Sequence, residues 1–254
     1  MRSFAFVLTL LGLAAASALE AQEVYPPSEA YRLRLEYRFW HPSLDSQIRE
    51  GTQGTEVDET DLGIGDERTF EARGALQLAR GHKLRGSYAR LDLDGDVEFH
   101  RFFRFGSTEY PHYARVVTSM KGGYYTGDYQ FDVFKGSQGY LGGLVGARIF
   151  DLDALLVAPA EGKREQETLR APIPVLGITG RVYAGRVSFS GEVAGLTIGK
   201  KGHLFELQIS AAGHVSDRLA VTGGYRMLAL HGETDEDSLN FRLGGWHFGG
   251  EVSF

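Results

Sequence analysis

The sequence has no cysteine, fewer basic than acidic residues and, after its first 18 residues, no long apolar run. Without cysteine it can form no disulfide, thiol nucleophile or cysteine-ligated metal site, and this composition suits an oxidising compartment. A membrane helix needs about 20 consecutive apolar residues, so a membrane-inserted chain of this kind must cross as strands. Its 27 basic residues, against 33 acidic ones, form no basic stripe, which argues against nucleic-acid binding.

The first 18 residues have the pattern of a cleaved signal peptide. Met1-Arg2 gives a positive start, residues 4–16 are apolar, and Ala16-Ser17-Ala18 supplies small residues at the cleavage site. We predict cleavage after Ala18, with Ala21 as the alternative. Removing these 18 of the 254 residues leaves 236, with 26 basic and 33 acidic residues and a formal charge of −7. This length fits one domain.

Alternation of apolar and polar residues predicts β-strands along the rest of the chain. It is clearest over residues 31–39, where Tyr31 and every second residue after it is apolar and the residues between are charged. We expect ten strands, most near the length of about 9–11 residues that a tilted spanning strand needs. They are 31–39, 68–78, 82–91, 120–134, 140–150, 173–183, 186–196, 203–214, 218–228 and 239–254. The facing of the glycine-rich strand 140–150 stays open.

The connections between these strands alternate between long and short. Those at 41–67, 92–118 and 151–170 are long, whereas those at 79–81, 135–139 and 184–185 are short. Long loops on one side and short turns on the other are typical of transmembrane antiparallel up-and-down β-barrels. We therefore predict an all-β barrel over 31–254, preceded by a periplasmic segment at 19–30. Eight strands are the alternative; twelve would require strands within 92–118.

The last strand carries a family resemblance. Trp246, Phe248, Val252 and the terminal Phe254 alternate with His247, Glu251 and small residues. This segment resembles the closing strand of bacterial outer-membrane β-barrels, and the whole mature chain is similar in style to the eight- and ten-stranded OmpA/OmpX-like proteins. The resemblance implies a Gram-negative outer-membrane location with both termini periplasmic. It also implies that Phe254 is an assembly signal read by the barrel-assembly machinery, that periplasmic chaperones escort the chain, and that it contacts outer-membrane lipid and lipopolysaccharide.

Charged residues recur on one face of strand after strand, which suggests that they line the barrel lumen. The predicted lumen ion-pair network comprises Arg32, Arg34, Glu36, Arg38, Glu71, Arg73, Lys83, Arg85, Asp128, Asp132, Arg181, Glu192, Glu206, Arg226 and Glu251. Eight bases and seven acids nearly balance, as buried charges must when they cannot be hydrated individually. A ten-stranded barrel is close to the size that side chains fill. The lumen is then either closed by ion pairs, which we favour, or a narrow porin for small polar solutes.

Two of the long connections are acidic. Residues 41–67 hold eight acids against Arg49 alone, and residues 233–237 hold four. Such acids could hold a divalent cation, but a run of this kind is more often a solvated surface. Asp92, Asp94 and Asp96 resemble the start of a calcium loop without its bidentate Glu, and we interpret them as a glycine-containing bend where a strand leaves the membrane. We expect no bound metal and no cofactor.

The connection 92–118 has a different character. Residues 97–105 face 110–117 across Gly106-Ser107-Thr108, a pattern that predicts a β-hairpin above the membrane. Its aromatic and basic residues suit binding of a glycan, a lipid headgroup or a protein, although they could equally cover the barrel mouth. The candidate binding residues are Phe99, Arg101, Phe102, Phe103, Arg104, Phe105, Tyr110 and Tyr113.

Enzymes are known among small outer-membrane barrels, notably the omptin proteases and the lipid A-modifying barrels. Here His100 near the Asp92–Asp96 segment, or His231 near Glu233 and Asp235, could form an acid–base pair. No segment matches the motifs of those families, and no Gly-x-Ser-x-Gly elbow occurs. We therefore expect a non-enzymatic protein with a structural, adhesion or surface-binding role through its external loops. A rim-located protease or lipid A-modifying enzyme is the less favoured alternative.

Three further histidines lie on predicted strands. His203 and His214 fit interfacial or lumen positions better than metal ligation, and His247 is expected in the lumen network near Glu251.

Overall fold

A computed structural model describes residues 29–49, 57–58, 64, 68–98, 103–105, 108–110, 115–197, 202–233 and 238–254. The described residues form ten long strands: β1 (Leu33–Arg49), β3 (Thr69–Ala79), β4 (His82–Glu98), β7 (Arg115–Gly136), β8 (Gly139–Ala158), β9 (Lys163–Ala184), β10 (Val187–Thr197), β11 (Gly202–His214), β12 (Leu219–Glu233) and β13 (Ser238–Ser253). The short strands are β2 (Val57–Asp58), β5 (Phe103–Phe105) and β6 (Thr108–Tyr110), and a 3-10 turn η2 covers Pro159–Glu161.

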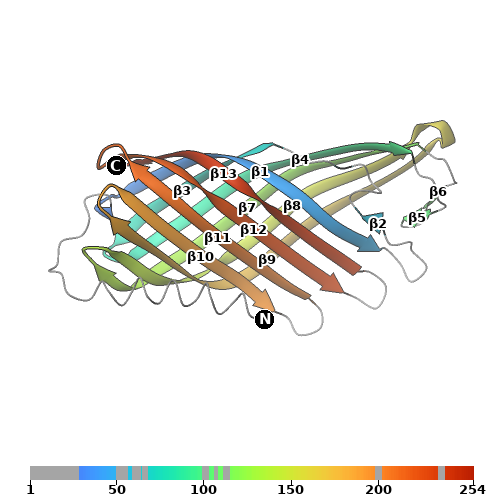
Figure 1. Ribbon diagram of the computed structural model, residues 1–254. Coiled ribbons are helices and arrows are strands. Elements are labelled where there is room, and N and C mark those ends of the chain that lie inside the picture. Colours follow the sequence, from blue (N-terminus) through green and yellow to red (C-terminus); the bar gives the residue numbers. More distant parts are fainter. Residues whose placement is uncertain are drawn as a thin grey trace, which may run out of the picture.

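The ten long strands close into one antiparallel barrel (Figure 1). Each strand pairs with the next along the chain, and β13 pairs with β1 from Arg34↔Ser253 to Arg49↔Ser238. The C-terminus is fixed at this seam, because the amides of Arg32 and Leu33 donate to the Phe254 carbonyl. The prediction of ten strands is confirmed. Within the described residues, no helix is both long enough and apolar enough to cross a bilayer.

The two ends of the barrel differ in their connections. At the turn end, where Phe254 lies, the connections between β3 and β4, β7 and β8, β9 and β10, and β11 and β12 are short. The turns at Gly81 and Gly185 require positive φ, 81° and 61°, which glycine adopts without steric cost. The opposite end, the loop end, holds the longer connections. The long loop expected at 151–170 is wrong, since β8 and β9 continue to a turn at residues 159–162, and β4 and β7 extend beside them at the same end (Figure 1).

An apolar band covers the outer wall near the turn end, as lipid contact requires. Its exposed members include Leu35, Tyr37, Phe39, Leu84, Tyr125, Phe131, Val145, Leu176, Phe189, Ile209, Val221, Trp246 and Phe248. Aromatic rings adjoin across the strands at its loop-end edge: Phe39 stacks on Phe248, and Tyr225 meets Trp246 edge-on. Side chains with a polar tip and a large apolar body suit a lipid–water boundary.

Beyond this band the long strands other than β3 exchange their polar and apolar faces, while the pairing between strands continues in the same register. On β4, Leu84 points outward and Lys83 and Arg85 inward, but further along the strand Leu91 and Leu93 are 1% exposed inside the barrel. Asp94, between them and the strand end, is exposed on the outer wall. The expected bend at Asp92–Asp96 is therefore wrong, because β4 runs straight through this segment to Glu98.

The interior of the loop-end half is consequently an apolar core, hereafter the apolar section. Its buried members are Trp40, Leu44, Ile64, Ala89, Leu91, Leu93, Val116, Tyr124, Phe150, Leu152, Leu156, Ala158, Val175, Ala194, Leu204, Leu228, Phe241 and Leu243. They come from every long strand except β3. A charged outer wall fits water better than lipid, and apolar side chains on a water-exposed wall gain free energy by turning inward. Facing acids and bases pair on the outer wall of this half, as between Arg115 and Asp96 and between Arg170 and Asp151.

The predicted hairpin is present in its described part. β5 and β6 form a separate two-stranded sheet, with Phe103 opposite Tyr110 and Phe105 opposite Thr108. Below it, β4 and β7 stay paired up to Glu98↔Arg115. Phe99, Arg101, Phe102 and Tyr113 lie outside the described residues.

The exchange of faces predicts opposite responses at neighbouring positions of β4. Leu91→Asn places an amide in the apolar section and removes a buried side chain, so we expect a loss of about 3 kcal/mol of unfolding free energy. Asp92→Asn alters only ion pairs with the exposed Arg90 and Lys121 on the outer wall and should change the free energy by less than about 1 kcal/mol. Urea unfolding of the refolded protein, followed by heat-modifiable gel mobility, measures both. Equal effects would show that Leu91 does not face an apolar interior.

Candidate functional site

The turn-end half of the lumen is filled with charged side chains. The structure places Arg34, Glu36, Arg38, Glu71, Arg73, Lys83, Arg85, Asp128, Asp132, Arg181, Glu192, Glu206, Arg226 and Glu251 inside the barrel. Arg32 is the exception and its assignment is wrong: it precedes the first residue of β1, at the turn end, and its side chain is exposed. The alternation that placed Arg32 inside begins only at Leu33, where pairing with β3 and β13 starts.

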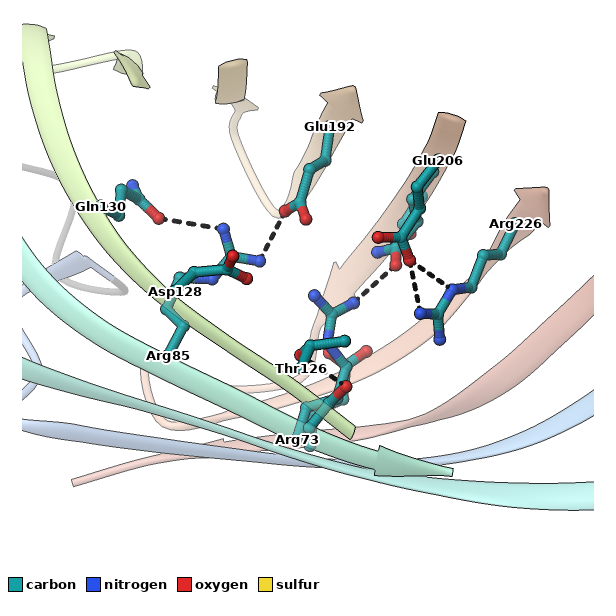
Figure 2. A network of polar contacts seen from close by, with 12 residues as sticks. Arg73, Arg85, Thr126, Asp128, Gln130, Glu192, Glu206 and Arg226 are labelled. Carbon is teal, nitrogen blue, oxygen red and sulfur yellow. Dashed lines mark hydrogen bonds and ion pairs between the residues drawn. The ribbon is translucent and has the colours of Figure 1, made fainter. Parts of the chain in front are cut away.

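The middle of the lumen holds one continuous chain of alternating charges. Arg226 is its centre: its Nη1 lies 2.7 Å from Glu71 Oε1, and its Nε donates to Glu206 Oε1 at 2.9 Å. Glu206 also accepts from the Nε of Arg148 at 2.7 Å. Figure 2 shows Arg226 facing Glu206 from the neighbouring strand.

The chain continues on both sides of this centre. Arg148 Nη1 donates to Asp128 at 2.6 Å, and its Nη2 lies 3.8 Å from Glu192. Glu192 in turn accepts from Arg85 at 2.5 Å, and Gln130 accepts from the same guanidinium (Figure 2). On the other side, Arg38 bridges Glu71 at 3.6 Å and Glu36 at 2.7 Å. The chain therefore crosses the lumen and ties together β1, β3, β4, β7, β8, β10, β11 and β12.

A second cluster closes the lumen at the turn end. Glu29, just before β1, lies 3.1 Å from Arg34 and 3.2 Å from Lys83, and it accepts a hydrogen bond from the Tyr183 hydroxyl. Burial alone would raise the pKa of Glu29, but the charges of Arg34 and Lys83 outweigh it and lower the pKa to about 2. The segment before β1 thus enters the barrel as a carboxylate plug.

Two acids further along the chain complete this cluster. Asp132 lies 3.0 Å from Lys83, and Glu251 accepts from Arg181 at 3.0 Å and lies 3.3 Å from Arg34. With these pairs, all ten long strands contribute at least one charge to the lumen. The two clusters together hold eight cations, Arg34, Arg38, Arg73, Lys83, Arg85, Arg148, Arg181 and Arg226, and eight carboxylates, Glu29, Glu36, Glu71, Asp128, Asp132, Glu192, Glu206 and Glu251.

Sequence reasoning missed two members of this network. Arg148 lies on β8, whose predicted facing was left open because glycines interrupt the alternation there. The register with Thr126 on β7 fixes Arg148 as inward, and it is 1% exposed. Glu29 lies outside any strand, in a segment interpreted as a lead-in, and no periodic signal marks it. The surplus of eight predicted bases over seven acids was the available hint that further partners exist.

The boundary between the charged lumen and the apolar section is built around Arg226. Its guanidinium carbon lies 5.2 Å from the centroid of the Trp40 ring and 5.1 Å from that of Tyr124. Aromatic faces stabilise a cation electrostatically while presenting apolar surface on the other side. The side chains of Trp40, Tyr124 and Arg226 therefore join the two halves of the interior.

The histidines considered as candidates lie apart. His231 is on the outer wall near the loop end, where its Nδ1 is 2.6 Å from Asn240 Oδ1 and its ring adjoins that of His203 on β11. Its Nε2 lies 3.9 Å from Glu233. His100 and Asp235 lie outside the described residues. His214 and His247 face the lumen and contact Ser188 and Ser210 respectively.

Comparison with solved structures finds the same fold. Outer-membrane protease OmpT from Escherichia coli superposes with a TM-score of 0.55 at 9% identity, covering 93% of this chain and 100% of OmpT. Ail, the attachment invasion locus protein of Yersinia pestis, matches at 13% identity with a TM-score of 0.35, covering 88% of this chain and 99% of Ail. No protein-family model and no curated protein matches the sequence. The OmpT likeness shows the fold of an outer-membrane β-barrel.

The chain of alternating charges predicts that one carboxylate is critical. Glu206→Gln leaves both Arg148 and Arg226 with a neutral partner in place of an anion, so we expect a loss of about 3 kcal/mol of unfolding free energy. Glu233→Gln, an exposed change of the same chemistry, should stay within about 0.5 kcal/mol of the unsubstituted protein. Urea unfolding in detergent measures both. A Glu206→Gln protein as stable as the Glu233→Gln control would show that the network does not hold the barrel together.

Proposed function

We propose that this protein is a non-conducting, non-enzymatic outer-membrane barrel that works as a scaffold for its loop end. The observation that carries this proposal is the apolar section. A pore for polar solutes needs a continuous polar path, and ions crossing an apolar, side-chain-filled segment would lose their hydration without compensation. Trp40, Phe150 and Leu243, each at most 1% exposed, lie across that path.

The charged half of the lumen supports the same proposal. Apart from Arg73, which bonds to Gln208, its cations are paired with carboxylates, and Glu29 occupies the turn end. The role we infer for these pairs is to hold the ten strands in register inside lipid. For the protein to act as a narrow porin, this ion-pair network would have to open, and the side chains of the apolar section would have to move apart at the same time.

In the proposed orientation the turn end faces the periplasm and the loop end faces the outside. The apolar band between them then contacts outer-membrane lipid and lipopolysaccharide. The strands beyond it, which carry ion pairs such as Asp96–Arg115 on their outer wall, project into water. Phe254 lies at the turn end beside β1, where the barrel-assembly machinery would read it as an assembly signal.

The hairpin of β5 and β6 is the surface that we propose for binding. The connection between β4 and β7 that contains it has Arg101 and Arg104 among aromatic residues in its sequence, a composition suited to an anionic ligand with a flat or ring-shaped face. β5 and β6 pair with each other in a sheet separate from the barrel, and they lie at the loop end, below the tip of β8 and β9 in Figure 1. An acidic glycan is the ligand class that this composition fits best.

Planar-bilayer recording tests the closed lumen. We expect no single-channel steps from the refolded protein or from Arg34→Ala, because the apolar section seals the path whatever the charge at the turn end. A porin prepared in the same detergent serves as the positive control, and heat-modifiable mobility confirms folding. Reproducible steps that change with Arg34→Ala would make the protein a small-solute channel and contradict the proposal.

Binding to an immobilised sulfated polysaccharide tests the hairpin. We expect salt-sensitive binding by the unsubstituted protein and at least tenfold weaker binding by the Arg101→Ser/Arg104→Ser variant, because two cations leave the proposed surface. The matched control is Lys200→Ser/Lys201→Ser, which removes two cations from the connection between β10 and β11. Equal weakening in both variants would assign binding to general charge, and no binding by the unsubstituted protein would remove the acidic-glycan proposal.

A further inference from the structure

A cavity of about 90 Å³ lies inside the charged half of the barrel. That volume is enough for several waters or for one small solute. Its walls come from both clusters of the lumen, and the polar residues that line it include Arg34, Glu36, Arg38, Arg73, Arg85, Gln130, Thr179, Arg181, Ser190, Glu192, Gln208, Ser210, Thr222 and Glu251. The apolar section separates it from the loop end.

The wall of this cavity carries more positive than negative charge, although the lumen as a whole is balanced. Five guanidinium groups line it, against the three carboxylates Glu36, Glu192 and Glu251. The balance is restored by acids that do not line the cavity. Glu71 and Glu206 are held by Arg226, and Asp132 is held by Lys83. More cations than carboxylates therefore line the cavity, and the carboxylates that balance them lie elsewhere in the lumen.

Arg73 is the cation that this arrangement leaves without an ion pair. Within the part of the chain that the structure describes, no carboxylate oxygen lies within 4.0 Å of its nitrogens, and its Nη1 donates to the Gln208 amide oxygen at 2.7 Å. A guanidinium has five N–H donors in a planar fork. Arg73 is partly exposed and lines the cavity, so its remaining donors are open to water or to an anion there.

We propose that this cavity binds a small oxyanion of the size of sulfate or phosphate, with Arg73 as its principal contact. Guanidinium forks match oxyanions through paired N–H bonds, which favours an oxyanion over a halide. The hydroxyls of Ser190 and Ser210 on the same wall supply further donors. Anion binding in this cavity does not depend on ligand binding by the hairpin, so it is a property separate from the proposed function.

Tyr31 lies between the cavity and the turn end. Tyr31 lines the cavity and also lines a groove at that end, together with Arg32 and residues 76–80. The Arg34 guanidinium stacks on the Tyr31 ring at 3.9 Å, so the inner side of this partition is positively charged.

Calorimetric titration of the refolded mature protein with sodium sulfate, at fixed ionic strength with chloride, tests the site. We expect saturable binding to the unsubstituted protein, at least tenfold weaker binding to Arg73→Gln, and unchanged binding to Arg170→Gln, whose exposed side chain lies on the outer wall of the loop-end half. Sulfate also stabilises proteins by exclusion from their surface, but that effect does not saturate and all three proteins share it. The absence of saturable binding, or equal affinity in Arg73→Gln, overturns the proposal.

A second measurement does not depend on the folding of a variant. Crystals of the unsubstituted protein soaked in selenate should show an anomalous selenium peak in the cavity, within hydrogen-bond reach of the Arg73 guanidinium. A cavity that holds only water or chloride after the soak overturns the proposal, even where Arg73→Gln fails to give the folded, heat-modifiable form.

Discussion

The contact between Glu206 and the guanidinium groups of Arg148 and Arg226 is the one on which the rest of the interior depends. Two cations from β8 and β12 share one carboxylate from β11, and the charges then alternate outward to Glu36 on one side and Arg85 on the other. None of these groups could be buried alone, because an unpaired ion in a low-dielectric interior is strongly unfavourable. The pairs form only when strands far apart in the sequence stand at one height around the barrel. The sheet must therefore close into a barrel for the lumen charges to be paired, and the charges must be paired for the closed barrel to be stable.

The second constraint is the solvent outside each half of the barrel. Where lipid surrounds the wall, apolar side chains face outward and the charges are confined inside. Where water surrounds it, the same strands turn Leu91, Phe150 and Leu243 inward and leave Asp94 and Arg170 outside. The exchange happens within one or two residues on β1, between Phe39 and Trp40, while the hydrogen-bonding register with β13 continues unbroken. The turn-end part of this strand thus has the side-chain pattern of a membrane-spanning strand, and its loop-end part has the pattern of a water-exposed barrel with an apolar core.

Much of this could be read from the sequence, and the misses have physical reasons. Residues 31–39 alternate so regularly that strand and facing were predictable, and the rhythm of turns gave the strand number. Alternation has the same period whichever face meets lipid, so Leu91, Asp92 and Leu93 carried no sign of which side was inside. The predicted strand ended at Leu91 and the residues from Asp92 onward were assigned to a loop, so the apolar section was not predicted. Arg148 was missed because neighbouring glycines weaken the pattern, and Glu29 because its place is set by Arg34 and Lys83 rather than by any local periodicity. The hairpin and the acidic connections depend on ligands or solvent that no pattern specifies.

Thiol accessibility tests the division of the interior most directly, because the chain has no native cysteine. Ala212, which lines the cavity, and Ala194, in the apolar section, lie on neighbouring strands and are 5% and 1% exposed, so Ala212→Cys and Ala194→Cys are matched probes. Silver ion would be added to the reconstituted protein, and the remaining free thiol measured after unfolding, with the exposed Ser216→Cys as the fully reactive reference. The account predicts reaction at position 212 from the turn end and protection at position 194 from both ends. Rapid reaction of Ala194→Cys from the loop end would contradict it, because the apolar section would then be open to water.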